Sequence, residues 1–181
     1  ARFGATPAGG VNRLALSPEE IDARQALVAW GSEFGAQAGV DDAGNLYLRL
    51  AGREPALPPV LLGSHIDTQP TGGKFDGTYG VLGGLAVLRA IAASGRRPRR
   101  SVEVVAWMNE EGSRFAPGMM GSAVFAGKRS LDEILAVRDR AGISVAEALQ
   151  TVLQTEHALE RRPAGHPVAA YLEAHIEQGP T

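Results

Sequence analysis

The chain has 181 residues, enough for one domain with a full core, and its 44% hydrophobic and 21% charged residues are typical of a globular protein. A formal net charge of -2 leaves no polybasic field, so neither nucleic acid nor an anionic membrane is expected as a partner. The absence of cysteine excludes disulfides, thiolate metal sites and a cysteine nucleophile. With no signal peptide at its start and no apolar run near the roughly 18 residues of a membrane span, the chain is expected to be cytoplasmic.

The first predicted element is a helix that begins at residues 17–20. This segment is a capping box with proline at the first helical position. Leu27, Trp30 and Phe34 follow at helical spacing and predict one buried face. The helix is expected to end before Gly39.

Four strands and a second helix are predicted in the middle and at the end of the chain. Residues 46–50 alternate in polarity like a half-buried strand. The apolar segment 60–62 predicts a strand covered on both faces, and 102–107 and 168–172 are the other predicted strands. Apolar residues recur at helical spacing over 78–94, which predicts a helix.

Two further capping boxes, at Ser130 and Ser144, predict short helices that run to about Arg140 and Gln154. Residues 160–167 are polar and contain proline, which indicates a loop. Strands and helices therefore alternate along the chain without an internal repeat. This order predicts a layered α/β domain.

The strongest functional observation is that three predicted strands end near histidine or carboxylate residues. The strands lead to His65, Glu110 and His175. Ligands bind at the carboxyl ends of strands in open α/β sheets, so the three segments are expected to meet at one site.

Asp67 and Asp76 are the acids that could serve His65. Period two in an extended segment places His65 and Asp67 on one face, where the carboxylate could orient a metal-bound imidazole. Asp76 lies between glycines that allow close backbone approach, and its carboxylate could bridge two cations. Taken alone, His65 fits a surface or core histidine, and Asp76 a turn aspartate bonded to its own backbone.

Glu110 and Glu111 are adjacent acids at a strand end, where neighbouring side chains point in opposite directions. One could bind metal while the other handles a proton, although an isolated Glu-Glu pair is more often surface charge. Without cysteine, this set of donors suits zinc, manganese or cobalt. His157 and His166 have no partner carboxylates at ligand spacing and are expected to be solvent-exposed.

Four ordered motifs, at 63–68, 73–77, 109–115 and 175–180, together resemble the M20-type dinuclear metal amidohydrolases. Within that group they are similar to the carbamoylase branch, which comprises N-carbamoyl-L-amino acid hydrolases, β-ureidopropionases and allantoate amidohydrolases. The resemblance covers nearly the whole chain. It implies hydrolysis of a C-N bond in a small carbamoyl or ureido substrate by water that two divalent cations activate.

The resemblance also implies roles for individual residues. The implied metal ligands are His65, Asp76 as the bridge, Glu111 and His175. Glu110 is implied as the general base, Asp67 as the residue that orients His65, and Gln178 as a substrate contact. A cis peptide bond is implied at Asp76-Gly77.

The implied fold is a three-layer αβα sandwich with a mixed, mostly parallel sheet. Residues 1–181 would be the N-terminal part of the catalytic domain, because the lid and dimerisation domain of the family follows this point. The family's further metal-binding histidine, near the far C-terminus, has no counterpart here, since no histidine follows His175. The parent protein is expected to be a homodimeric enzyme.

Two other interpretations stay open. An aminoacylase or dipeptidase of the same superfamily would use the same metals. The chain could instead be an inactive fragment that holds little metal.

Overall fold

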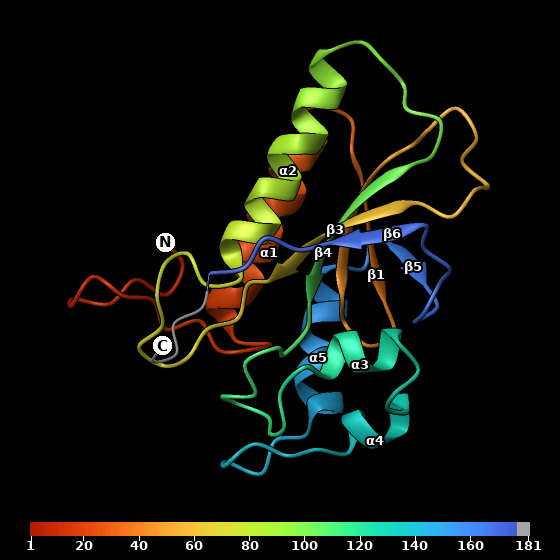
Figure 1. The fold of residues 1–181 in the computed structure, drawn as a ribbon. Helices are drawn as coiled ribbons and strands as arrows, with labels where there is room; N and C mark the ends of the chain where they lie inside the picture. The colour runs from red at the N-terminus through yellow and green to blue at the C-terminus, as the bar shows by residue number, and fades with distance from the viewer. Residues whose placement is uncertain (177–181) are drawn as a thin grey trace.

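Residues 1–176 are described here by a computed structural model (Figure 1). Within them, six strands form one mixed sheet in the order β5-β1-β2-β4-β3-β6. The strands are β1 (Gln37–Asp41), β2 (Leu46–Leu50), β3 (Val60–His65), β4 (Val102–Trp107), β5 (Glu160–Arg162) and β6 (Ala170–Leu172). β3 runs parallel to both β4 and β6, β1 runs parallel to β5, and β2 is antiparallel to its two neighbours. The predicted α/β class with a mixed, mostly parallel sheet is confirmed.

Two long helices, α1 (Pro18–Ser32) and α2 (Thr78–Ala93), cover one face of this sheet (Figure 1). The Ser17 hydroxyl accepts a hydrogen bond from the Glu20 backbone N–H at 3.3 Å, which confirms the predicted start of α1. Leu27 of α1 and Leu88 of α2 pack with the apolar side chains of β2 and β4 in one core cluster. This layer supports the strands that lead to the candidate site.

Three shorter helices lie together beyond the ends of the strands (Figure 1). They are α3 (Met120–Phe125), α4 (Leu131–Leu135) and α5 (Val145–Thr155). Their apolar side chains pack around Met108 and Phe115, which follow β4. On the sheet face opposite α1 and α2, Val105 and Trp107 pack against Phe125 and Val168. Every helix in the described part of the chain lacks the length and apolar character that a bilayer crossing requires.

The first helix and α4 both end earlier than predicted. α1 ends at Ser32 because the chain turns through Gly35 at φ 81°, and Gly39 lies inside β1. Trp30, expected on the buried face, is 39% exposed. The helix after Ser130 ends at Leu135 instead of reaching Arg140.

Three elements have no counterpart among the predictions. β1 and β5 carry glycine or charged residues where a strand pattern needs apolar ones, and α3 is only 6 residues long. Pairing creates β5, because its three residues align in parallel with residues 39–41 of β1. The expectation of a loop over 160–167 is therefore wrong for its first three residues.

His166 is the second correction, since it is not solvent-exposed. Its side chain is 18% exposed and lies edge-on to the ring of Tyr47. Its Nε2 lies 3.1 Å from Oε2 of Glu103, a fully buried carboxylate that Arg49 and Arg162 also contact, at 2.7 and 3.1 Å. Burial alone would raise the pKa of Glu103, but the hydrogen bond from His166 and the charge of Arg162 lower it to about 2. His157 is exposed, as predicted.

Candidate metal centre

The three strands that end near histidine or acid residues are neighbours in the sheet and run in the same direction. His65 is the last residue of β3 and pairs with Trp107, the last residue of β4. β6 pairs with the other edge of β3, where Leu172 aligns with Leu62. The carboxyl ends of the strands therefore lie at one edge of the sheet, as the sequence predicts.

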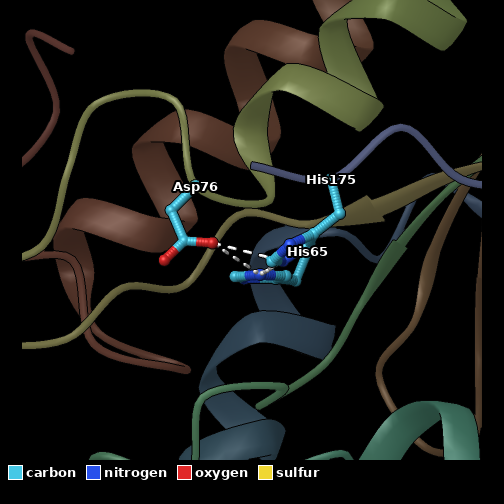
Figure 2. A group of neighbouring side chains, drawn as sticks. All are labelled: His65, Asp76 and His175. Atoms are coloured by element: carbon cyan, nitrogen blue, oxygen red, sulfur yellow. Dashed lines mark hydrogen bonds and ion pairs between the residues drawn. The ribbon is translucent and has the colours of Figure 1, made fainter. Parts of the chain in front are cut away.

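At this edge His65, Asp76 and His175 converge on one point (Figure 2). The two Nε2 atoms lie 3.3 Å apart, and Asp76 Oδ1 lies 3.6 Å from His65 Nε2 and 3.2 Å from His175 Nε2. Ligands bound at about 2.0–2.1 Å around a tetrahedral zinc lie roughly 3.3 Å apart. The three side chains thus have the donor types and separations that suit a zinc-sized cation.

Gly77 lets Asp76 approach the histidines. It has a φ of 60°, and a Cβ atom at this position would overlap the His65 ring. The expected cis bond between Asp76 and Gly77 is wrong for this structure: in residues 1–176 the cis peptide bond is the one before Pro117. The chain turns instead through the positive φ of Gly77.

Asp67 is buried beneath the site and contacts both of the strand ends beside it. Its carboxylate accepts the backbone N–H groups of Glu110, at Oδ1, and Glu111, at Oδ2, each at 3.1 Å. His65 Nδ1 lies 3.0 Å from the Asp67 carbonyl oxygen and 3.6 Å from Oδ1. One aspartate therefore holds the His65 ring and the backbone of the Glu-Glu pair in a fixed relation.

Glu110 is the acid nearest to His65 outside this triangle, with its Oε2 3.4 Å from His65 Nε2. Its side chain is 29% exposed, so it faces the open side of the site. Burial raises the pKa of Glu110, the His65 charge opposes this, and the Asp67 charge adds to it. A glutamate with a raised pKa beside a metal site suits a proton acceptor that works near neutral pH.

Glu111 turns away from Glu110 toward the loop that follows β3. Its Oε2 accepts a hydrogen bond of 2.6 Å from Gln69 Nε2, while its Oε1 is buried and has no hydrogen-bond partner in the described structure. Burial raises the pKa of Glu111, the Gln69 bond lowers it, and the nearby Asp76 charge raises it. A buried carboxylate oxygen without a donor has the chemistry of a cation ligand.

The charges around His65 also favour a cation at the site. Burial alone would lower its pKa, but the hydrogen bond and charge of Asp67, with the charge of Glu110, raise it to about 9. The acidic surroundings therefore favour a positive charge at this ring. A metal ion needs the neutral imidazole and would take the place of the proton.

Glu173 holds the segment that carries His175 in place through side-chain hydrogen bonds. The sequence analysis did not predict these contacts. Its carboxylate accepts hydrogen bonds from the hydroxyls of Ser64, at 2.5 Å, and Tyr171, at 2.8 Å. Trp107 Nε1 donates to the Tyr171 hydroxyl at 2.8 Å. The period-two spacing of Tyr171, Glu173 and His175 was the available indication. Gln178, the expected substrate contact, lies outside the described residues.

The structure thus brings together six of the seven residues expected at the site. The sequence analysis did not single out Gln69, because no residue near it in the sequence indicates a partner in the loop after β4. The donors present are imidazole nitrogens and carboxylate oxygens, which fit zinc, manganese or cobalt.

The chain is similar to known amidohydrolases. Residues 61–181 match the peptidase family M20/M25/M40. An N-carbamoyl-L-amino-acid amidohydrolase of Rhizobium meliloti is 42% identical over 182 residues, which cover 99% of this chain and 42% of the relative. An allantoate amidohydrolase of Bacillus subtilis is 35% identical over 187 residues, which cover 100% of this chain and 44% of the relative.

A solved structure agrees with the sequence matches. The crystal structure of a hydantoinase/carbamoylase family amidase from Burkholderia ambifaria has a TM-score of 0.93 and 48% identity, and the match covers 99% of this chain and 44% of that one. The chain spans less than half the length of the curated relatives it matches. The resemblance drawn from the four motifs is confirmed, and the chain belongs to the peptidase family M20/M25/M40.

Proposed function

We propose that the protein is a metal-dependent hydrolase that cleaves the C-N bond of an N-carbamoyl amino acid or a related ureido compound. The observation that carries this proposal is the convergence of His65, Asp76 and His175 at one sheet edge, with Glu110 beside them. The names of the similar enzymes, two amidohydrolases that act on carbamoyl or allantoate substrates, supply the substrate class.

In this proposal His65 and His175 would hold a first cation, Asp76 would be shared with a second, and Glu111 would hold the second through its Oε1. Zinc is the expected metal, with manganese or cobalt as alternatives. When bound, the cations lower the pKa of a water molecule and polarise the substrate carbonyl.

The chain's own residues then handle the proton and hold the geometry. Glu110 Oε2 accepts the proton of the attacking water and delivers it to the departing nitrogen. Asp67 keeps Glu110 and Glu111 in place through their backbone N–H groups. With a carbamoyl substrate, the products are the free amine, ammonia and carbon dioxide.

An aminoacylase or dipeptidase would use the same ligands, so the described geometry fits both reactions. The carbamoylase interpretation is favoured because both named relatives are amidohydrolases of non-peptide C-N bonds, and because the match to each spans nearly the whole chain. The choice between the two reactions depends on groups that contact the rest of the substrate, with Gln178 as our candidate.

We further propose that residues 1–181 form the N-terminal part of a catalytic domain in a longer, cytoplasmic, homodimeric protein. The lid and dimerisation domain, and the rest of the catalytic domain, would lie outside this chain. Relatives more than twice as long support this division. The net charge of -2 supports a small-molecule substrate over nucleic acid or an anionic membrane.

The decisive experiment uses the natural full-length protein, freed of metal and reloaded separately with zinc, manganese and cobalt. We expect hydrolysis of an N-carbamoyl amino acid, ureidopropionate or allantoate, and weaker or no activity on N-acetyl amino acids and dipeptides. Glu110→Gln should retain both ions and lose about 10²–10⁴-fold in kcat. Turnover of acetylated substrates alone would favour the aminoacylase.

The fragment interpretation is tested on the 181-residue chain itself. Elemental analysis after dialysis against metal-free buffer counts the bound ions. Two tightly held ions per chain would rule out a metal-poor fragment, whereas no retained metal would show that further residues are needed to complete the site.

A further inference from the structure

Glu111 is the end of a short chain of hydrogen bonds that links two loops. The Ser113 hydroxyl donates to Gln69 Oε1 at 2.7 Å, and Gln69 Nε2 donates to Glu111 Oε2 at 2.6 Å. Gln69 belongs to the loop after β3, whereas Glu111 and Ser113 belong to the loop after β4. All three side chains line an open cleft of about 580 Å³.

The carboxylate of Glu111 fixes the direction of these hydrogen bonds, because an ionised carboxylate can only accept. The NH2 group of Gln69 therefore faces Glu111, and its amide oxygen faces the Ser113 hydroxyl, which donates to it. The amide is neutral, so it holds one carboxylate oxygen without cancelling the negative charge of Glu111. A lysine or arginine in its place would compete with a cation for that charge.

The two carboxylate oxygens of Glu111 consequently differ in their hydrogen bonding. Oε2 is occupied by the Gln69 amide, and Oε1 is buried with no partner among the described residues. An unsatisfied buried oxygen on a charged group is unfavourable unless a ligand completes it. The Asp67 carboxylate accepts the backbone N–H of Glu111, and the Gln69 amide in turn restricts the orientation of the Glu111 carboxylate.

We propose that Gln69, supported by Ser113, is a positioning residue that makes Glu111 a one-oxygen ligand of the second cation. The proposal rests on the dinuclear site of the proposed function. Gln69 acts by excluding two-oxygen binding and by aiming Oε1 into the site, much as outer-sphere partners orient other metal ligands. It touches neither cation itself.

The test replaces Gln69 in the full-length protein with methionine, which has a similar length and no N–H donor. Zinc affinity is measured by competition with a chelator, and the absorption spectrum of the cobalt-loaded protein reports the coordination. In Gln69→Met we expect one ion to bind about 10–100-fold more weakly, with the other unchanged and an altered cobalt spectrum. Ser113→Ala should shift the same ion in the same direction by less.

Gln150→Leu is the matched control, because Gln150 is exposed on α5 and has no part in the site. Circular dichroism of all three variants checks that they fold, and Ser113→Ala keeps the test informative if Gln69→Met does not. If the wild type binds two ions and Gln69→Met binds both unchanged but has a higher KM, Gln69 contacts substrate and the inference is overturned while the proposed function stands. A wild-type protein that binds one ion or none would overturn both.

Discussion

The substitution Asp67→Asn removes one carboxylate oxygen and leaves the shape of the side chain almost unchanged. Asp67 accepts two backbone N–H groups, one from Glu110 and one from Glu111. The amide of the variant offers one oxygen and one NH2 group, so either of its orientations sets a donor against one of these N–H groups.

The cost follows from the burial of Asp67, which is 1% exposed. Leaving one buried N–H without an acceptor costs about 1–3 kcal/mol. The bond that remains is no longer charge-assisted and is roughly half as strong. Together these effects predict a loss of about 2–4 kcal/mol in the free energy of unfolding.

Metal binding should weaken in parallel, because the same carboxylate lies 3.6 Å from Nδ1 of His65 and holds the backbone of Glu111. Loss of an outer-sphere partner typically lowers metal affinity about 10–100-fold. Without the Asp67 charge, the pKa of His65 should also fall from about 9 toward its ordinary value.

Urea unfolding and zinc competition on the full-length protein measure the two effects. Asp132→Asn, at an exposed position in α4, should change stability by less than about 0.5 kcal/mol and serves as the control. An Asp67→Asn variant that matches the wild type in both stability and zinc affinity would show that Asp67 does not hold the backbone of Glu110 and Glu111 in place.

Two further predictions concern a buried carboxylate and a glycine. Because folding lowers the pKa of Glu103 from 4.5 to about 2, its stabilising effect is present above pH 4.5 and is lost as the pH falls toward 2, a change of about 3 kcal/mol. The difference in unfolding free energy between wild type and Glu103→Gln should therefore shrink over that window in urea titrations, and a constant difference would contradict the role of its cationic neighbours. Gly77→Ala should lower the thermal midpoint and abolish tight zinc binding, because the new methyl group overlaps the ring of His65. Gly95→Ala has a similar φ of 66° in open space, so it isolates backbone strain and should leave zinc binding intact.

Interactions between residues close in sequence determine the features that the sequence predicts by itself. The hydroxyls of Ser17 and Ser144 cap helices at their predicted starts, because a cap involves only residues within one helical turn. The strand that ends in His65 and the strand before Glu110 were also predicted, since apolar runs and their ends are visible in the chain. The motifs around these residues were specific enough to indicate the family, which the match over residues 61–181 confirmed.

Contacts between segments distant in sequence determined the other features of the fold and the candidate site. Only the parallel order of β4, β3 and β6 brings Nε2 of His65 to 3.3 Å from Nε2 of His175, 110 positions along the chain. The bond between Gln69 and Glu111 joins loops from two strands, and β5 exists because β1 lies beside it. Such contacts depend on how the helices and strands pack. The pattern of residues close in sequence does not specify that packing. The sequence thus predicted which side chains would form the site, and the tertiary structure set the distances between those of them that it describes.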